Sequence, residues 1–259
     1  QLTINIFVPA LLFSVLIDET FKPSEHIDLA IAAIMVILVS GILAWMFSKL
    51  AKFDIKTFVP PMMYANSGNI GLPLALLAFG ESAMPIAITL FMIENTLHFT
   101  LGVKTINRNS SIIGVLRIPM VSISLLAIIL NLLTYKPSEL LLMPLEMLGN
   151  IAIPLMLFSL GIRLKDINFQ DWKIGLTGAI FKPLSGIVAA ILILPWFEFN
   201  ALSYAMIVIF AILPPAVLNF MVAEKYQQDP KAVASIVLIG NLFAVITIPI
   251  ALYFLLPSI

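Results

Sequence analysis

The stretch that decides the fold is Asn66-Ser67-Gly68-Asn69-Ile70-Gly71-Leu72-Pro73, at the centre of an apolar segment over residues 57–79. The segment is long enough to cross a bilayer as one helix. Its glycines and its proline weaken that helix, and its amide and hydroxyl groups are polar. A second apolar segment, residues 200–223, carries Leu213-Pro214-Pro215 at its centre. Two interrupted helices at corresponding positions of two halves predict the central binding site of a secondary transporter.

The composition predicts a helical membrane protein that crosses the bilayer many times. Of the 259 residues, 61% are hydrophobic and 11% are charged, and the mean hydropathy is +1.09. Apolar runs of about 20 residues recur along the chain. The formal net charge is zero, so we expect no nucleic-acid partner. The sequence has no cysteine, which excludes disulfides, thiolate metal sites and cysteine nucleophiles.

The basic residues predict how the chain is oriented. We expect nine spans, at residues 2–17, 28–50, 57–79, 82–103, 111–134, 144–162, 173–196, 200–223 and 231–256. Eleven lysines and arginines lie in or beside the loops after the second, fourth, sixth and eighth spans, and two lie in the alternate loops. The positive-inside rule places the richer loops in the cytoplasm. We therefore expect a multi-pass protein of the cell membrane (inner or plasma membrane) with its C-terminus outside.

The two halves of the chain repeat at a constant offset of 145 residues. Asn5-Ile6 matches Asn150-Ile151, and Ser40-Gly41-Ile42 matches Ser185-Gly186-Ile187. The fifth span has no counterpart in the first half, so we expect that the first helix is missing. The predicted units are a first repeat at residues 1–110 without its first helix and a second repeat at residues 111–259. Five helices per complete repeat would make the second repeat inverted relative to the first.

The interruptions supply the candidate binding residues. Each break creates new helix ends, and the N-terminus of a half-helix carries partial positive charge and free N–H groups that suit a carboxylate. The alternative is a pair of proline kinks with asparagines that hold neighbouring helices together. The predicted substrate-binding residues are Asn66, Ser67, Gly68, Asn69, Gly71, Pro73, Pro214, Pro215 and Asn219.

Three titratable residues within spans are candidates for coupling or charge. Glu94 and Lys182 lie at similar depth, and charged groups there are costly and usually functional. They could form a structural ion pair, or they could carry a proton or face the substrate. His98 follows Glu94 by four residues, on the same helical face. The coupling ion, H⁺ or Na⁺, stays open, as does transport driven by membrane potential alone, and no cofactor or metal site is expected.

The Asn66–Leu74 stretch resembles the signature of the auxin efflux carrier family, which includes plant PIN auxin carriers and bacterial permeases for malonate and similar acids. Asn150–Gly161, Lys182-Pro183 and Leu213–Pro215 resemble the family's seventh, eighth and ninth helices. The resemblance implies ten spans in two inverted repeats, a fold like that of bile-acid sodium symporters. It implies a substrate site at the crossing of two broken helices, and a homodimer. The short loop at 104–111 is typical of a prokaryotic permease.

Our interpretation is a secondary transporter of a small organic anion, a mono- or dicarboxylate, that works by alternating access in the lipid bilayer. A bile-acid-type sodium symporter is the nearer alternative. An intramembrane enzyme is disfavoured because no His-Glu-x-x-His motif, no aspartate pair within a span and no cysteine occur in the sequence. A receptor on the same scaffold that does not transport stays open.

Overall fold

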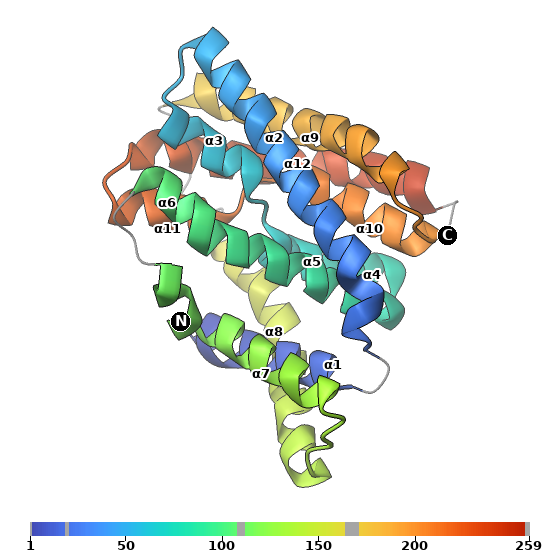
Figure 1. The fold of residues 1–259 in the computed structure, drawn as a ribbon. Coiled ribbons are helices and arrows are strands. Elements are labelled where there is room, and N and C mark those ends of the chain that lie inside the picture. The colour runs from blue at the N-terminus through green and yellow to red at the C-terminus, as the bar shows by residue number, and fades with distance from the viewer. Residues whose placement is uncertain (1, 19–20, 108–111, 164–170, 257–259) are drawn as a thin grey trace.

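The computed structural model describes residues 2–18, 21–107, 112–163 and 171–256, and Figure 1 shows its fold. These residues form helices and connecting loops, with no β-strand among them. The α-helices are α1 (Val8–Ile17), α2 (Ile27–Ala51), α3 (Ile55–Met63), α4 (Leu72–Phe79), α5 (Met84–Leu97), α6 (Val103–Ile106), α7 (Pro119–Leu132), α8 (Glu139–Arg163), α9 (Trp172–Ile193), α10 (Ala201–Ile212), α11 (Val217–Lys225) and α12 (Pro230–Leu255).

Short helical segments complete the chain. Three are π-helices that run directly into an α-helix: η1 (Thr3–Phe7) precedes α1, η3 (Ser67–Gly71) precedes α4, and η5 (His98–Gly102) joins α5 to α6. Four are 3₁₀-helices: η2 (Pro23–His26), η4 (Glu81–Ala83), η6 (Ile112–Arg117) and η7 (Leu194–Trp196). The predicted boundary between the repeats, at residues 110 and 111, lies outside the described residues.

The helices are those of a membrane protein. Five are long and apolar enough to cross a bilayer, namely Pro23–Ala51, Glu81–Ile106, Glu139–Ser159, Trp172–Trp196 and Pro230–Leu255. Four shorter apolar helices, Asn5–Ile17, Ser67–Phe79, Pro119–Leu132 and Ala201–Ile212, fall within other predicted spans. Large apolar side chains such as Leu140, Val245 and Tyr253 lie on the outer surface, where a lipid environment suits them. The all-helical membrane class is confirmed, and the count of nine spans stays a prediction.

The helices form two packed groups. In the first, α1 packs against both α7 and α8. In the second, α9 packs against α2, α10 and α12, and α2 also contacts α3 and α5. Figure 1 shows α1, α7 and α8 below the remaining helices. The groups touch where α8 meets η3 and α4, and where α1 and α7 meet α5. The site described below lies along this contact.

Two short helices in the second group begin at capping side chains. The Asp54 carboxylate accepts a hydrogen bond from the Thr57 N–H at the start of α3 (2.9 Å). The Asn200 side chain accepts one from the Ser203 N–H at the start of α10 (2.8 Å). Each cap satisfies one of the free N–H groups of a helix N-terminus. Both helices then run toward the centre of the molecule and end there.

Candidate functional site

The first interruption lies at Tyr64–Asn66 and overlaps the predicting stretch only at Asn66. Helix α3 ends at Met63, and helical geometry resumes at Ser67. Gly68, Gly71 and Pro73, which were expected to weaken this helix, therefore lie after the break rather than at it. Gly68 and Gly71 lie inside η3, and Pro73 is the second residue of α4, which continues η3 without a break.

The glycines of η3 instead permit close packing. A Cβ atom on Gly71 would lie 2.9 Å from the ring of Phe210 and 3.0 Å from the Leu213 side chain. A Cβ atom on Gly68 would lie 3.0 Å from the ring of Phe91. The first interrupted helix thus packs against the second through Gly71, and against α5 through Gly68.

The second interruption lies at Leu213–Ala216, where the prolines predicted it. Helix α10 ends at Ile212 and α11 begins at Val217. Pro215 would be the helical donor to the carbonyl of Ala211, and Pro214 would be the donor to the carbonyl of Phe210. Neither has an N–H, so the helix cannot continue through them without losing two hydrogen bonds.

The structure brings the two interruptions into contact through their backbones. The Asn66 N–H donates to the Pro214 carbonyl (2.7 Å), and the Ala216 N–H donates to the Tyr64 carbonyl (2.9 Å). Ala65 and Pro215 form an antiparallel β-bridge between these two bonds. Each break therefore supplies partners for polar backbone groups that the other break exposes, as backbone at membrane depth requires.

Asparagine side chains surround this backbone bridge. Asn66 donates through Nδ2 to Oδ1 of Asn241 on α12 (2.8 Å), and Asn241 donates to the Pro215 carbonyl (3.0 Å). Asn69 donates to Oδ1 of Asn66 (3.1 Å). Asn219 donates to the Tyr64 carbonyl (3.0 Å), and its own Oδ1 is buried without a hydrogen-bond partner among the described residues. Side-chain amides from both interrupted helices and from α12 thus hold the backbone bridge in place.

Glu94 and Lys182 also reach the interruptions, each from a neighbouring helix. Both are buried. The Glu94 carboxylate on α5 accepts a hydrogen bond from the Ala65 N–H. The Lys182 ammonium on α9 donates to the Ala211 carbonyl at the end of α10 (3.3 Å). Both side chains line one cavity of about 30 Å³, but they form no ion pair within 4.0 Å.

His98 lies one helical turn after Glu94 and faces the same break, as the four-residue spacing suggested: Glu94 contacts Ala65, and His98 contacts the adjacent Tyr64. His98 begins the π-helix η5, and its ring stacks on Tyr64 with ring centroids 4.4 Å apart. Tyr64 is fully buried, and its hydroxyl has no hydrogen-bond partner in the described part of the chain. His98 therefore packs behind the first break.

A polar cavity of about 110 Å³ opens beside the bridge, between the two helix groups. Of the predicted binding residues, Asn66, Ser67, Gly68 and Asn69 line it. The other five predicted residues do not line it: Gly71, Pro73, Pro214, Pro215 and Asn219. Pro214 and Pro215 lie at the second break, and Asn219 lies in the first turn of α11. The start of α11 contributes Val217 and Leu218. The breaks themselves add Ala65 and Ala216. The other lining residues come from η1, α1, α5, α7, α8 and α11 and include Thr3, Asn95, Met120, Met156 and Ser159.

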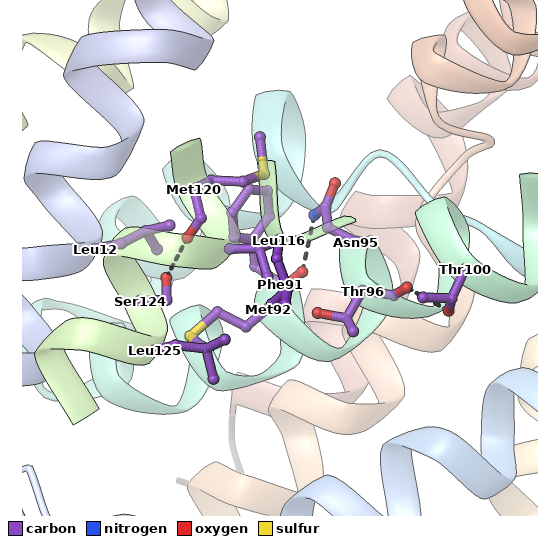
Figure 2. A pocket seen from close by; sticks show the side chains of 11 residues that line it. Leu12, Phe91, Met92, Asn95, Thr96, Thr100, Leu116, Met120, Ser124 and Leu125 are labelled. Atoms are coloured by element: carbon purple, nitrogen blue, oxygen red, sulfur yellow. Dashed lines mark hydrogen bonds between the residues drawn. The ribbon is translucent and has the colours of Figure 1, made fainter. Parts of the chain in front are cut away.

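A larger apolar pocket of about 370 Å³ adjoins this cavity, and the two share Phe91, Asn95 and Met120. Figure 2 shows how its polar side chains turn back to their own helices. Ser124 donates to the Met120 carbonyl (2.6 Å), and Asn95 donates to the Phe91 carbonyl (2.8 Å). Since these groups are already bonded, the pocket presents mostly hydrocarbon.

Comparison with known proteins places this architecture in a family. Residues 108–252, or 145 of 259 residues, match the family model described as membrane transport protein. The chain is also 26% identical over 242 residues to an uncharacterized transporter of the archaeon Methanocaldococcus jannaschii, covering 86% of this chain and 77% of that one. Fold and comparisons together define a multi-pass membrane transporter. The chain belongs to the membrane transport protein family, the auxin efflux carrier family that its sequence resembles.

Sequence reasoning missed two features of the site. Asn241 joins both breaks, yet its sequence signal was only a near match to Asn95 across the repeat, one residue out of register. The antiparallel pairing of Ala65 with Pro215 had no signal, because neither side chain carries chemistry. No group of three or more histidine, aspartate or glutamate side chains suited to a metal ion occurs in the described ranges.

Proposed function

We propose that the protein is a secondary transporter that binds a small organic anion at the crossing of its two interrupted helices. One observation carries the proposal: two half-helix N-termini and the amides of Asn66 and Asn69 meet at one polar cavity. The first N–H groups of a helix have no acceptor within it. These groups are therefore free to donate to an anion, and the helix dipole favours negative charge there.

The shape of the site favours a substrate with one carboxylate and an apolar body. The polar cavity has the volume of about three to four water molecules in the liquid. Its described lining residues include no lysine or arginine, so a second carboxylate would find no cationic partner there. The adjoining apolar pocket can take a hydrocarbon part. We therefore rank amphipathic monocarboxylates above dicarboxylates as substrates.

The two packed groups of helices support an alternating-access mechanism. The cavity lies between α1, α7 and α8 on one side and the interrupted helices on the other. Rocking of one group against the other would expose the site to each face of the membrane in turn. We further propose that the repeats at residues 1–110 and 111–259 are inverted relative to each other, that the C-terminus lies outside the cell, and that the protein forms a homodimer. With that orientation the cavity lies on the cytoplasmic side of the bridge.

Uptake by reconstituted protein tests the proposal. Purified protein in liposomes is given radiolabelled monocarboxylates of increasing apolar length and, in parallel, dicarboxylates. Asn69→Ala removes an amide whose described hydrogen bond is to Asn66 alone, so the fold survives. A hydrogen bond to a charged group contributes about 1.5–3 kcal/mol. We therefore expect uptake at low substrate concentration to fall about 10- to 100-fold.

The matched control is Thr177→Ala, a half-buried residue of α9 whose hydroxyl bonds to its own helix. It should transport like the wild type. Equal uptake by Asn69→Ala and the wild type would refute a site at the crossing. Faster uptake of dicarboxylates than of monocarboxylates would refute the ranking of substrates.

A further inference from the structure

The apolar pocket between α5 and α7 opens to the surface of the helix bundle. Helix α7 belongs to the first packed group and α5 to the second, so the pocket lies at the contact between the two groups. Figure 2 shows side chains from both helices around it. Among its lining residues, Thr96, Leu116 and Leu125 are exposed. In a protein that crosses the membrane, an opening between two spans faces lipid rather than water.

The chemistry of the pocket suits hydrocarbon and not water. Its volume is about 370 Å³, and the polar side chains of Asn95 and Ser124 already bond to their own helices. A water molecule in a cavity needs two to four polar partners, and an apolar cavity of about 150 Å³ stays dry and takes up benzene or xenon. An empty pocket would forfeit the dispersion contacts of its lining. Hydrocarbon is therefore the material that fills it best.

The pocket has the length and the position of one lipid acyl chain. Its lining runs from Thr100 to Phe91 on η5 and α5, and from Leu116 to Leu125 on η6 and α7. Each stretch advances by nine residues, or about 14 Å at a rise of 1.5 Å per residue. One leaflet of the hydrocarbon core is about 15 Å thick. Thr100 and Leu116 lie at the same end, where η5 contacts η6. The pocket thus extends from one membrane surface to about the middle of the bilayer.

Basic residues lie at the end of the pocket that reaches the membrane surface. Lys104 follows Thr100 by one helical turn, and Arg117 follows Leu116 directly. Both are exposed, and neither forms an ion pair with a described residue. No aspartate or glutamate occurs between residues 95 and 138 of the sequence, so this part of the chain does not offset the positive charge. An anionic lipid headgroup is complementary to such a surface.

We propose that this pocket binds an anionic phospholipid, with one acyl chain between α5 and α7 and the phosphate beside Lys104 and Arg117. With the proposed orientation, the lipid belongs to the cytoplasmic leaflet. The chain closes the crossing cavity toward the membrane, because that cavity and the pocket share Phe91, Asn95 and Met120. The apolar part of the proposed substrate uses the same space, so lipid and substrate exclude each other there. This last consequence rests on the proposed function.

Photolabelling without any transport substrate tests the proposal, so its failure is distinct from failure of the proposed function. The purified protein is reconstituted in phosphatidylcholine liposomes with a small fraction of phosphatidylglycerol that carries a diazirine in the middle of one acyl chain. Mass spectrometry locates the labelled peptides. The exposed face of α12, with Val245 and Tyr253, gives the background from bulk lipid. We expect residues 91–100 and 116–125 to be labelled about 10-fold or more above it, because each basic residue near the membrane surface enriches an anionic lipid about 5-fold.

Two neighbouring residues of α7 supply matched variants. Leu125 lines the pocket and Leu126 does not, although both are exposed. Leu125→Trp fills the pocket with a side chain and should lower the labelling of both stretches to the α12 background, whereas Leu126→Trp should be labelled like the wild type. Thr96→Trp fills the pocket from α5 and should give the same loss, which keeps the test decisive if Leu125→Trp does not fold.

Competition between unlabelled lipids tests the headgroup. Unlabelled phosphatidylglycerol should displace the label at about 10- to 30-fold lower mole fraction than phosphatidylcholine with the same chains. In the double variant Lys104→Gln with Arg117→Gln, the two lipids should compete alike. Lys173→Gln removes an exposed lysine of α9 and should keep the wild-type ratio.

Any of four results would overturn the proposal. The first is labelling of both stretches at the α12 background in the wild type, because the pocket is then closed or filled by protein. The second is undiminished labelling in folded Leu125→Trp and Thr96→Trp variants. The third is equal displacement by phosphatidylcholine and phosphatidylglycerol in the wild type. The fourth is displacement by a free fatty acid at lower concentration than by phosphatidylglycerol, because the pocket then prefers a soluble amphiphile to a membrane lipid.

Discussion

The two interrupted helices differ in where they break, and the difference shows how they meet. Helix α3 has nine residues before its break, and 13 residues follow from Ser67 to Phe79. Helix α10 has 12 residues before its break and α11 has nine after it. Figure 1 shows the nine-residue halves α3 and α11 on one side of the crossing and the longer halves on the other. The Gln228 amide donates to Asp54 and joins the ends of the short halves (3.1 Å).

This arrangement explains why the breaks do not follow the repeat offset. The ends of α3 and α10, Met63 and Ile212, are 149 positions apart rather than 145. The two interrupted helices run antiparallel. If their breaks meet away from the midpoint, the break comes early in one helix and late in the other, and the spacing between the breaks then differs from the repeat offset. At 1.5 Å per residue, each short half spans about 14 Å and each long half about 18–20 Å. The crossing is therefore off-centre.

The breaks also differ in chemistry. The first carries its own polar side chains, because Asn66, Ser67 and Asn69 line the cavity. Other helices bond to the backbone of both breaks, but with opposite polarity at the carbonyls and N–H groups of each: Asn241 and Lys182 donate to carbonyls at the second, and Glu94 accepts from an N–H of the first. We infer that the side chains of the first break contact the ligand and that the second break holds the first break in position. Substitutions at paired positions of the two halves can separate these roles.

The largest difference is expected between Gly186→Ala and Gly41→Ala, which are repeat-related positions. A Cβ atom at 186 would strike the backbone carbonyl of Ala211, which is fixed at the second break. A Cβ atom at 41 would strike the flexible end of the Met63 side chain, which can turn away. Overpacking costs about 1–3 kcal/mol, whereas alanine gains up to about 1 kcal/mol over glycine in a helix.

We therefore expect Gly186→Ala to lower the thermal midpoint in detergent by about 10 °C and Gly41→Ala to change it by no more than about 2 °C. Similar decreases of the thermal midpoint in both variants would show that the two glycines are packed equally closely, and would contradict the difference between the two halves.

A smaller difference is expected between Asn241→Ala and Asn95→Ala. Asn241 joins Asn66 to the Pro215 carbonyl, so its loss leaves buried polar groups on both breaks without a partner. Asn95 donates only to a carbonyl of its own helix among the described contacts. We expect losses of about 2 kcal/mol for Asn241→Ala and no more than about 1 kcal/mol for Asn95→Ala in denaturant unfolding. Equal losses would mean that the asparagine network does not hold the bridge.

Particular residues show which features of the fold and the site could be predicted from the sequence. The general position of both breaks was predictable, because Pro214 and Pro215 lack N–H groups and the 66–73 stretch is polar at membrane depth. The end of α3 at Met63 was not, because the glycines and Pro73, which weaken a helix, lie inside the helical segment that follows the break. Which helices contribute Asn241 and Lys182 to the breaks depends on packing across more than 25 residues of chain, which periodicity does not encode.

The smallest effect is expected at the outer ends of the interrupted helices, where the two halves are alike. Asp54 caps α3 and Asn200 caps α10, and an N-cap contributes about 1 kcal/mol. We expect Asp54→Ala and Asn200→Ala each to lower the free energy of unfolding by about that amount, and the double variant by about 2 kcal/mol, because distant sites add. Uptake per folded molecule should equal that of the wild type in all three. A loss of uptake confined to Asp54→Ala would show that the end joined to Gln228 moves during transport, and the asymmetry between the helices would then extend beyond their breaks.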